Sequence, residues 1–122
     1  MKTYGKKVWL FADAFYDSKY NTQVSHESVC VLNTSDKEAT ITMTLFFEDR
    51  GCLQGFAAKC GAMRTHHIRM DKLVSIDGLR VPSDVPYAIL VESDVEVVAQ
   101  YTRLETPQAE FALMTTMGFA GE

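Results

Sequence analysis

The chain has 122 residues, of which 47% are hydrophobic and 23% charged, and its formal net charge is −4. This length is typical of one domain that buries a core without disulfides or metals, and the composition is unlike that of a disordered protein. An acidic chain is a poor candidate for a protein that mainly coats nucleic acid, because neutralising phosphates requires basic residues. We expect a single domain over residues 1–122.

Targeting signals and cysteine frameworks are both missing from the sequence. No stretch approaches the ~18–20 apolar residues that a membrane span needs, and the apolar run Val8–Ala12 is too short for the core of a signal peptide. The three cysteines, Cys30, Cys52 and Cys60, form no regular framework and no CxxC pair, which is poor evidence for disulfides or zinc. We therefore expect a cytoplasmic protein without a cofactor.

A period of two dominates the chain and predicts strands. In Ala39–Phe47, apolar residues hold every odd position and threonine holds most even ones, as in a half-buried strand. We expect Ile41, Met43 and Leu45 to point into the core, with the threonines facing outward. The other expected strands are, in chain order, Val8–Ala12, Ser28–Leu32, Leu53–Ala58, Met63–Met70, Tyr87–Glu92 and Val95–Thr102.

Turn-forming residues between the strands predict two hairpins. Asn33–Lys37 should join Ser28–Leu32 to Ala39–Phe47. The short Ser93-Asp94 link should likewise pair Tyr87–Glu92 with Val95–Thr102.

The remaining segments are two long loops and the tail. Asp13–Val24 and Lys72–Val85 are expected to be loops, and long loops in a compact β domain often carry function. Residues 108–119 fit both a helical and an alternating pattern, and we favour a strand. About seven or eight short strands predict an all-β fold, an antiparallel sandwich or a jelly-roll-like barrel.

The densest polar cluster is Arg64–Arg69. Alternation places Thr65, His67 and Arg69 on one face of this strand, and Arg64 and His66 on the other. The two adjacent histidines therefore point in opposite directions and cannot bind the same metal ion.

A second polar cluster, Ser25-His26-Glu27, precedes a strand. A glutamate beside a histidine is compatible with acid–base chemistry, because a carboxylate can orient an imidazole. Adjacent residues on an extended chain point apart, however, so a junction held by side-chain hydrogen bonds is the simpler interpretation.

The third cluster, Gln100–Arg103, has Gln100 and Thr102 on one strand face. Polar groups on apolar strands need partners, so we expect these two side chains to lie close to His67 and Arg69. Amide and guanidinium donors suit hydroxyls and carboxylates, which would make the cluster a ligand site without a metal. A hydrogen-bonded network within an oligomer interface explains the pattern equally well.

Three separated segments resemble the soluble sensory rhodopsin transducer family. They are Ser25-His26-Glu27-Ser28-Val29-Cys30-Val31-Leu32-Asn33, Arg64-Thr65-His66-His67-Ile68-Arg69, and Gln100-Tyr101-Thr102-Arg103-Leu104 followed by Gln108-Ala109-Glu110. The similarity runs in order from about Trp9 to Phe119. The loops Asp13–Val24 and Gly51–Gly61 look different from the family pattern.

This resemblance implies an antiparallel β-sandwich that forms a homotetramer and has a signalling role without catalysis. It also implies a small-molecule ligand, such as a sugar or a related metabolite, and a membrane receptor or other signalling protein as partner. The matching positions suggest a set of ligand-binding residues: Trp9, His26, Glu27, Asn33, Arg64, His67, Arg69, Gln100, Thr102 and Arg103.

Two other functions remain open at this point. One is an enzyme that uses His26, Glu27 and His67, with or without a metal. The other is a DNA-binding regulator in which an oligomer aligns basic patches, although the net acidity disfavours nucleic acid as a ligand. Those patches would comprise Lys59, Arg64, Arg69 and Lys72.

Overall fold

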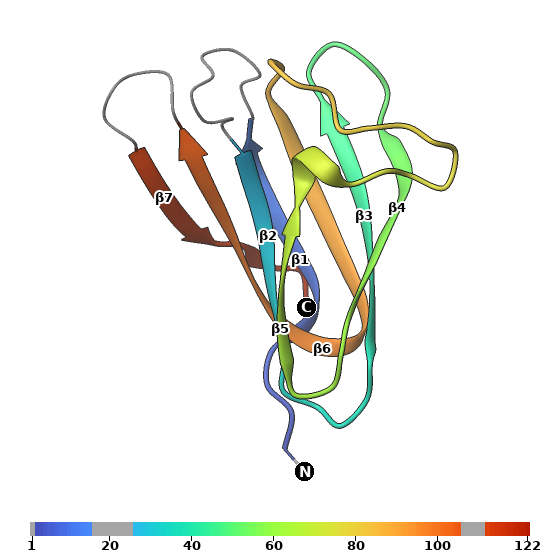
Figure 1. The fold of residues 1–122 in the computed structure, drawn as a ribbon, viewed down its shortest axis with the longest axis vertical. Helices are drawn as coiled ribbons and strands as arrows, with labels where there is room; N and C mark the ends of the chain where they lie inside the picture. The colour runs from blue at the N-terminus through green and yellow to red at the C-terminus, as the bar shows by residue number, and fades with distance from the viewer. Residues whose placement is uncertain (1, 16–25, 106–111) are drawn as a thin grey trace.

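The computed structural model describes residues 2–15, 26–105 and 112–122 (Figure 1). Most of them belong to strands, and all the strand pairings are antiparallel, which confirms the all-β fold. The strands are β1 (Lys6–Ala14), β2 (His26–Asn33), β3 (Ala39–Phe47), β4 (Leu53–Cys60), β5 (Arg64–Arg69), β6 (Tyr87–Glu105), β7 (Ala112–Met117) and β8 (Phe119–Ala120). The helical segment among the described residues is a single 3-10 turn, Met70–Lys72, and no described helix is long and apolar enough to cross a membrane.

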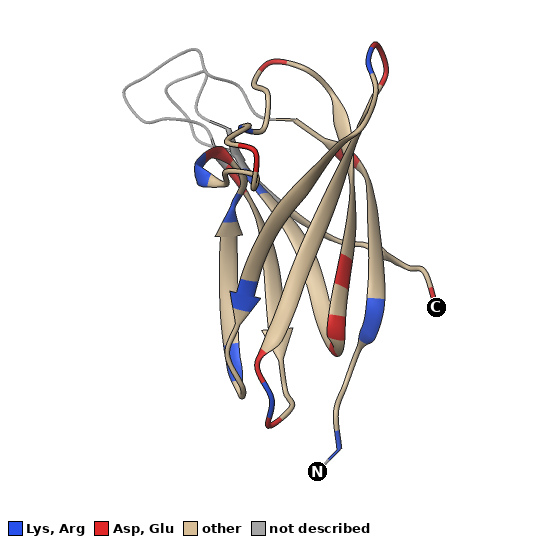
Figure 2. Ribbon diagram, turned by 90° about the vertical axis from the view of Figure 1, so that its right-hand side faces the viewer, with Lys and Arg blue, Asp and Glu red and all other residues tan. Residues whose placement is uncertain are grey.

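The strands form two sheets that share β6. The first, here called the β1 sheet, has the order β4-β3-β6-β1-β8. The second, the β2 sheet, has the order β5-β2-β6-β7. The two sheets pack as the layers of a sandwich, and charged residues lie mostly near strand ends and in loops (Figure 2).

The long strand β6 turns back on itself, as its path in Figure 1 shows. Its first half pairs with β1 and β3, and its second half pairs with β2 and β7. The chain reverses near Ser93-Asp94, where the Ser93 hydroxyl accepts a bond from the Val95 N–H at 3.2 Å. The Asp94 carboxylate accepts the Thr40 N–H at 2.8 Å. The predicted turn is therefore present, but the predicted hairpin is wrong because the two halves lie in different sheets.

The other expected hairpin, between Ser28–Leu32 and Ala39–Phe47, is also wrong. The first of these segments lies in β2, which pairs with β5 and β6. The second is β3, which pairs with β4 and β6. The turn after Asn33 thus carries the chain from one sheet to the other. Turn residues indicate where a strand ends, but the choice of partner depends on residues far along the chain.

The core lies between the sheets and is built by alternation. In β3, Ile41, Met43 and Leu45 are at most 2% exposed, whereas Thr40 and Thr42 face solvent, which confirms the expected register. The facing layer contributes Val29 and Val31 of β2 and Ile68 of β5, all buried. Burying each such side chain favours folding by about 1.5–3 kcal/mol.

The C-terminal segment changes sheet. β7 pairs with β6 and β8 pairs with β1, which confirms an extended tail over the described residues 112–120. Gly118 lies at the crossing, where a Cβ atom would come within 2.8 Å of Phe11 Cζ and 2.9 Å of the Leu10 carbonyl oxygen. Only glycine allows this approach without displacing the chain.

Two boundaries differ from the expected ones. Asp13 and Ala14, expected in a loop, belong to β1, and the rest of that loop from residue 16 lies outside the described residues. The loop Lys72–Val85 is irregular, apart from an isolated bridge between Val74 and Arg80.

Candidate functional site

The outer face of the β2 sheet carries four of the residues selected from the sequence. On β5, Ile68 points inward and is 3% exposed, so its neighbours His67 and Arg69 point outward. On β6, Ala99 and Tyr101 are completely buried, so Gln100 and Thr102 also point outward. All four side chains therefore share one face.

Strand β2 lies between these two pairs. Arg69 pairs with Ser28, which on its other side pairs with Thr102. One step along the sheet, Cys30 lies in the same way between His67 and Gln100. Two strand spacings of about 4.8 Å separate the two pairs, so they form two parallel rows across the face rather than one tight cluster.

Two of the four side chains on this face already make hydrogen bonds, and the other two are exposed. The Arg69 guanidinium donates two bonds to the Asp71 carboxylate, at 2.8 and 2.7 Å. Thr102 Oγ1 donates to Thr115 Oγ1 of β7 at 3.0 Å and lies 3.7 Å from Cys30 Sγ. His67 and Gln100 are exposed. The rows thus present guanidinium, imidazole, amide and hydroxyl groups, which suit hydroxyls and carboxylates.

A hollow of about 310 Å³ adjoins this face at β5. Its lining residues include His66, His67, Arg69 and Lys72. These are all basic or titratable nitrogen groups, so the hollow is a place where an anionic group would find donors.

A separate polar network lies inside the sandwich. The carboxylate of Glu27 on β2 is completely buried and accepts hydrogen bonds from the hydroxyls of Tyr87 and Tyr101. It also accepts the Phe15 N–H at 3.2 Å. The reversal of β6 brings its two tyrosines together, because one lies on each half of the strand. The network therefore ties both sheets to the end of β1.

Arg103 extends this network toward solvent. Its Nε donates to the Tyr101 hydroxyl at 3.2 Å, and its Nη2 lies 3.7 Å from the Asp13 carboxylate. Burial raises the pKa of Glu27, although the two tyrosine hydroxyls, the Phe15 N–H and the Arg103 charge act in the opposite direction. Burial also raises the pKa of Tyr101, and the nearby Glu27 charge adds to this effect.

The side chains of Trp9 and Arg64 donate hydrogen bonds to backbone carbonyls in two separate parts of the fold. Trp9 is 8% exposed, and its indole N–H donates to the Val97 carbonyl at 2.9 Å and to the Lys6 carbonyl at 3.2 Å. Arg64 is exposed and donates to the carbonyls of Ala62 and Met63, at 3.4 and 3.1 Å. Neither lies in the two rows of the outer face.

Asn33 is completely buried at the end of β2. Its amide nitrogen donates to the carbonyls of Lys37, Cys60 and Gly61, at 2.7, 3.1 and 3.1 Å. Its oxygen accepts bonds from the Ser35 N–H and hydroxyl, at 3.0 and 2.8 Å. Its side chain thus joins the turn that follows β2 to the end of β4 and has no hydrogen-bonding group left for a ligand. His26 belongs to β2, but its side chain lies outside the described residues.

The sequence-based set contained Glu27 and Arg103 and missed the tyrosines that hold them. Tyr87 and Tyr101 each occupy a core-facing position in an alternating strand, so each is indistinguishable from an ordinary core aromatic. The proximity of a carboxylate becomes visible only when the reversal of β6 is known. In the described part of the chain, no group of three or more His, Cys, Asp or Glu side chains could hold a metal ion.

Comparison with known proteins gives consistent results. The family model described as Anabaena sensory rhodopsin transducer matches residues 4–120. A crystal structure of Thermotoga maritima 1070 is 35% identical with a TM-score of 0.82, over 97% of both chains. The Anabaena sensory rhodopsin transducer is 26% identical with a TM-score of 0.72, over 83% of this chain and 84% of that one.

A search of curated protein sequences found no match. The family match nevertheless covers nearly the whole chain, and it agrees with the fold and with the motifs on β2, β5 and β6. The chain belongs to the Anabaena sensory rhodopsin transducer family.

Proposed function

We propose that the protein is a cytoplasmic, non-catalytic sensing domain that binds a small molecule as a homotetramer and relays a signal to a partner protein. Family membership supports the signalling role, because a family member of known structure carries the name of a sensory rhodopsin transducer. That name also makes a membrane receptor the first partner to consider.

One observation carries the ligand-binding part of the proposal. The outer face of the β2 sheet combines His67 and Arg69 on β5 with Gln100 and Thr102 on β6, two rows of polar side chains on a continuous four-stranded surface. A sugar or a related metabolite presents many hydroxyls and often a carboxylate or phosphate, and such groups match these donors. The ligand we propose is therefore a hydroxylated or anionic metabolite.

A thermal-shift screen against sugars and small organic acids tests this function, since a ligand that binds the native state raises its apparent stability. For a metabolite that stabilises the protein, the double variant Arg69→Ala/Gln100→Ala should lose the shift and keep the fold. Arg64→Ala is the matched control, because that exposed arginine lies outside the two rows and donates hydrogen bonds to the Ala62 and Met63 carbonyls of its own turn. Loss of the shift in the control as well would refute the assignment of the site.

Light scattering tests the assembly. A particle of 13.7 kDa, the mass of one chain, at tens of micromolar would refute the tetramer. If the double variant instead dissociates an oligomer, the two rows form an interface between copies and the proposed ligand site is wrong.

A further inference from the structure

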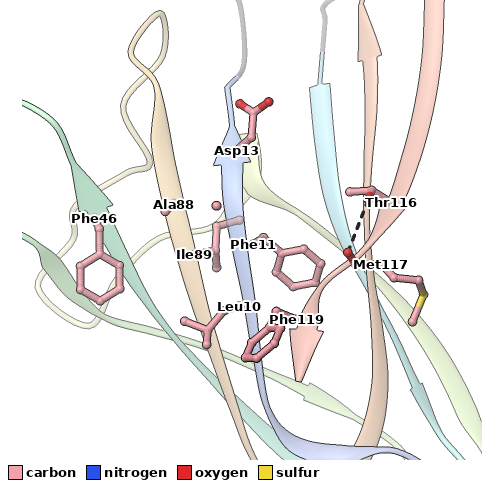
Figure 3. Close-up of a pocket in the computed structure, with 10 residues that line it drawn as sticks. Leu10, Phe11, Asp13, Phe46, Ala88, Ile89, Thr116, Met117 and Phe119 are labelled. Carbon is pink, nitrogen blue, oxygen red and sulfur yellow. Dashed lines mark hydrogen bonds between the residues drawn. The ribbon is translucent and has the colours of Figure 1, made fainter. Parts of the chain in front are cut away.

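An apolar groove lies on the outer face of the β1 sheet (Figure 3). It has a volume of about 550 Å³, within the range of ordinary ligand sites. Four large side chains that line it are exposed to solvent: Leu10 by 37%, Phe46 by 43%, Met117 by 52% and Phe119 by 74%. Folded monomers rarely leave so many neighbouring large apolar groups in water, so this surface favours a binding partner.

A second hollow of about 400 Å³ continues the groove toward the start of β6. The two hollows share Ala12, Asp13, Phe46 and Ala88. Together the two hollows are lined by residues of β1, β3, β6, β7 and β8, so a ligand that fills both would contact several strands of this face.

Within residues 2–15, 26–105 and 112–122, no strand covers the edge of β1 beside the groove beyond Leu10. Among the described residues, β8 pairs with β1 only at Trp9 and Leu10. Beyond Leu10, the recorded strand pairing of β1 is with β6, on its other side. A strand edge of this kind offers main-chain groups to an added strand. The groove and this open edge lie side by side.

The charged residues that line the two hollows are acidic. They are Asp13, whose side chain is 86% exposed, and Glu48, which is exposed as well. Two arginines pair with carboxylates of this region: Arg50 lies 2.9 Å from Asp49, and Arg103, whose side chain is only 13% exposed, lies 3.7 Å from Asp13. These pairs offset Asp49 and part of the Asp13 charge, so the rim of the groove keeps a modest negative charge on Glu48 and on the exposed carboxylate of Asp13.

We propose that this groove binds an extended segment of a partner protein in which apolar and basic residues alternate. The segment adds to the free edge of β1, its apolar side chains contact Leu10, Phe46 and Phe119, and its basic side chains face Asp13 and Glu48. Strand addition supplies the main-chain bonds, and the pockets for alternate side chains supply the selectivity.

This inference rests on the proposed relay to a partner and specifies its chemistry. The cytoplasmic segments of membrane proteins are enriched in lysine and arginine close to the bilayer. An acidic, apolar groove on the transducer is complementary to a segment of that kind. The groove lies on the β1 sheet, whereas the proposed metabolite site lies on the outer face of the β2 sheet.

Fluorescence anisotropy with designed peptides tests the proposal. The probe is a fluorescein-labelled peptide of about eight residues that alternates valine and lysine, the length of an ordinary strand. Matched peptides carry glutamine or glutamate in place of lysine. The lysine peptide should bind saturably, and the glutamate peptide should not bind. Equal binding of the two charged peptides would overturn the proposal.

Variants of the full chain locate the site. Asp13→Asn/Glu48→Gln should weaken binding of the lysine peptide about three- to tenfold, as expected for two exposed charges, and should not change binding of the glutamine peptide. Asp36→Asn/Asp77→Asn removes the same charge from two exposed positions outside the groove and should have no effect. If the two double variants weaken binding equally, the attraction is unspecific and the groove is not the site.

A second pair of variants tests the apolar contacts. Phe119→Ala should weaken the binding of both the lysine and the glutamine peptide. Ile76→Ala, at a position that is 87% exposed and lies outside the groove, should change the binding of neither peptide. If Phe119→Ala leaves peptide binding unchanged but reduces the particle size by light scattering, a second copy of the chain occupies the groove and the proposal fails. If no peptide binds but metabolites still stabilise the protein, the proposal of a peptide-binding groove is wrong, and the proposed ligand-sensing function is unaffected.

Discussion

The hydroxyl of Tyr101 donates a hydrogen bond to the carboxylate of Glu27, and both side chains are completely buried. The same carboxylate accepts a bond from Tyr87, which lies on the other half of β6. One carboxylate therefore joins the first half of β6, in the β1 sheet, to its second half, in the β2 sheet. The Ser25-His26-Glu27 motif is compatible with acid–base chemistry or, more simply, with a hydrogen-bonded junction, and the Glu27 carboxylate does hold such hydrogen bonds inside the sandwich.

Replacing either tyrosine by phenylalanine should destabilise the protein by about 1–3 kcal/mol. The ring is retained, but a completely buried carboxylate loses one of its donors. Urea unfolding measures the effect for Tyr87→Phe and Tyr101→Phe. Tyr4→Phe is the control, because Tyr4 is 55% exposed and its loss of a hydroxyl should change the free energy of unfolding very little. Equal effects at all three positions would contradict the network.

The stability of the protein should depend on pH through Glu27. Burial raises its pKa in the folded state above the ordinary value, so the folded chain holds this proton more tightly than the unfolded chain. The stabilising contribution is complete below the unfolded pKa of about 4.3 and is lost as pH rises through the folded pKa. Glu27→Gln removes this titration. Urea unfolding at several pH values between about 4 and 8 should show that the free energy of unfolding of wild type falls relative to that of Glu27→Gln as pH rises. If the difference between the two proteins does not change with pH, the pKa of Glu27 is not raised.

The register of β3 predicts unequal effects at adjacent positions. Met43 is 2% exposed, so Met43→Ala leaves a cavity and should cost about 2–5 kcal/mol. Thr42 faces solvent, and Thr42→Ala should change stability by less than about 1 kcal/mol. Both values come from chemical denaturation. Similar losses at the two sites would mean that the strand presents its other face to the core.

Asn33→Ala should reduce stability by at least about 2 kcal/mol, because it leaves buried carbonyl and N–H groups of the turn without partners. Asp36→Ala, at an exposed position of the same turn, should have a free energy of unfolding within about 0.5 kcal/mol of the wild-type value. If Asn33→Ala remains folded, any metabolite that raises the melting temperature of wild type should raise that of the variant by a similar amount. Loss of that shift without loss of stability would make Asn33 a ligand-binding residue.

Alternation of residue types predicts which face a side chain takes, and this part of the fold was accessible from the sequence. Ile41, Met43 and Leu45 lie in the core as expected, and His67, Arg69, Gln100 and Thr102 share one outer face. Pairing was not accessible, because it depends on contacts between distant segments. The insertion of β2 between β5 and β6, and the separation of the two halves of β6, have no local signature.

The interior network illustrates the same limit at the level of single residues. The Ser25-His26-Glu27 motif drew attention to Glu27, but nothing near it in sequence indicates two tyrosine partners. Asp13, expected in a loop, instead lies in the last part of β1, and its carboxylate is 3.7 Å from Arg103 Nη2. The register of β1 against β6 shifts between Phe11 and Ala14, and such an irregularity redirects side chains in a way that a period of two does not describe.

The position of β6 in the chain has a consequence for synthesis on the ribosome. It is the central strand of both sheets, yet it begins at Tyr87, after five other strands have emerged. Until then, only the β3–β4 and β2–β5 pairs can form, and each leaves an apolar face and open edges in water. Neither sheet can therefore be completed until the last third of the chain is released, and a chain truncated before Tyr87 should not fold.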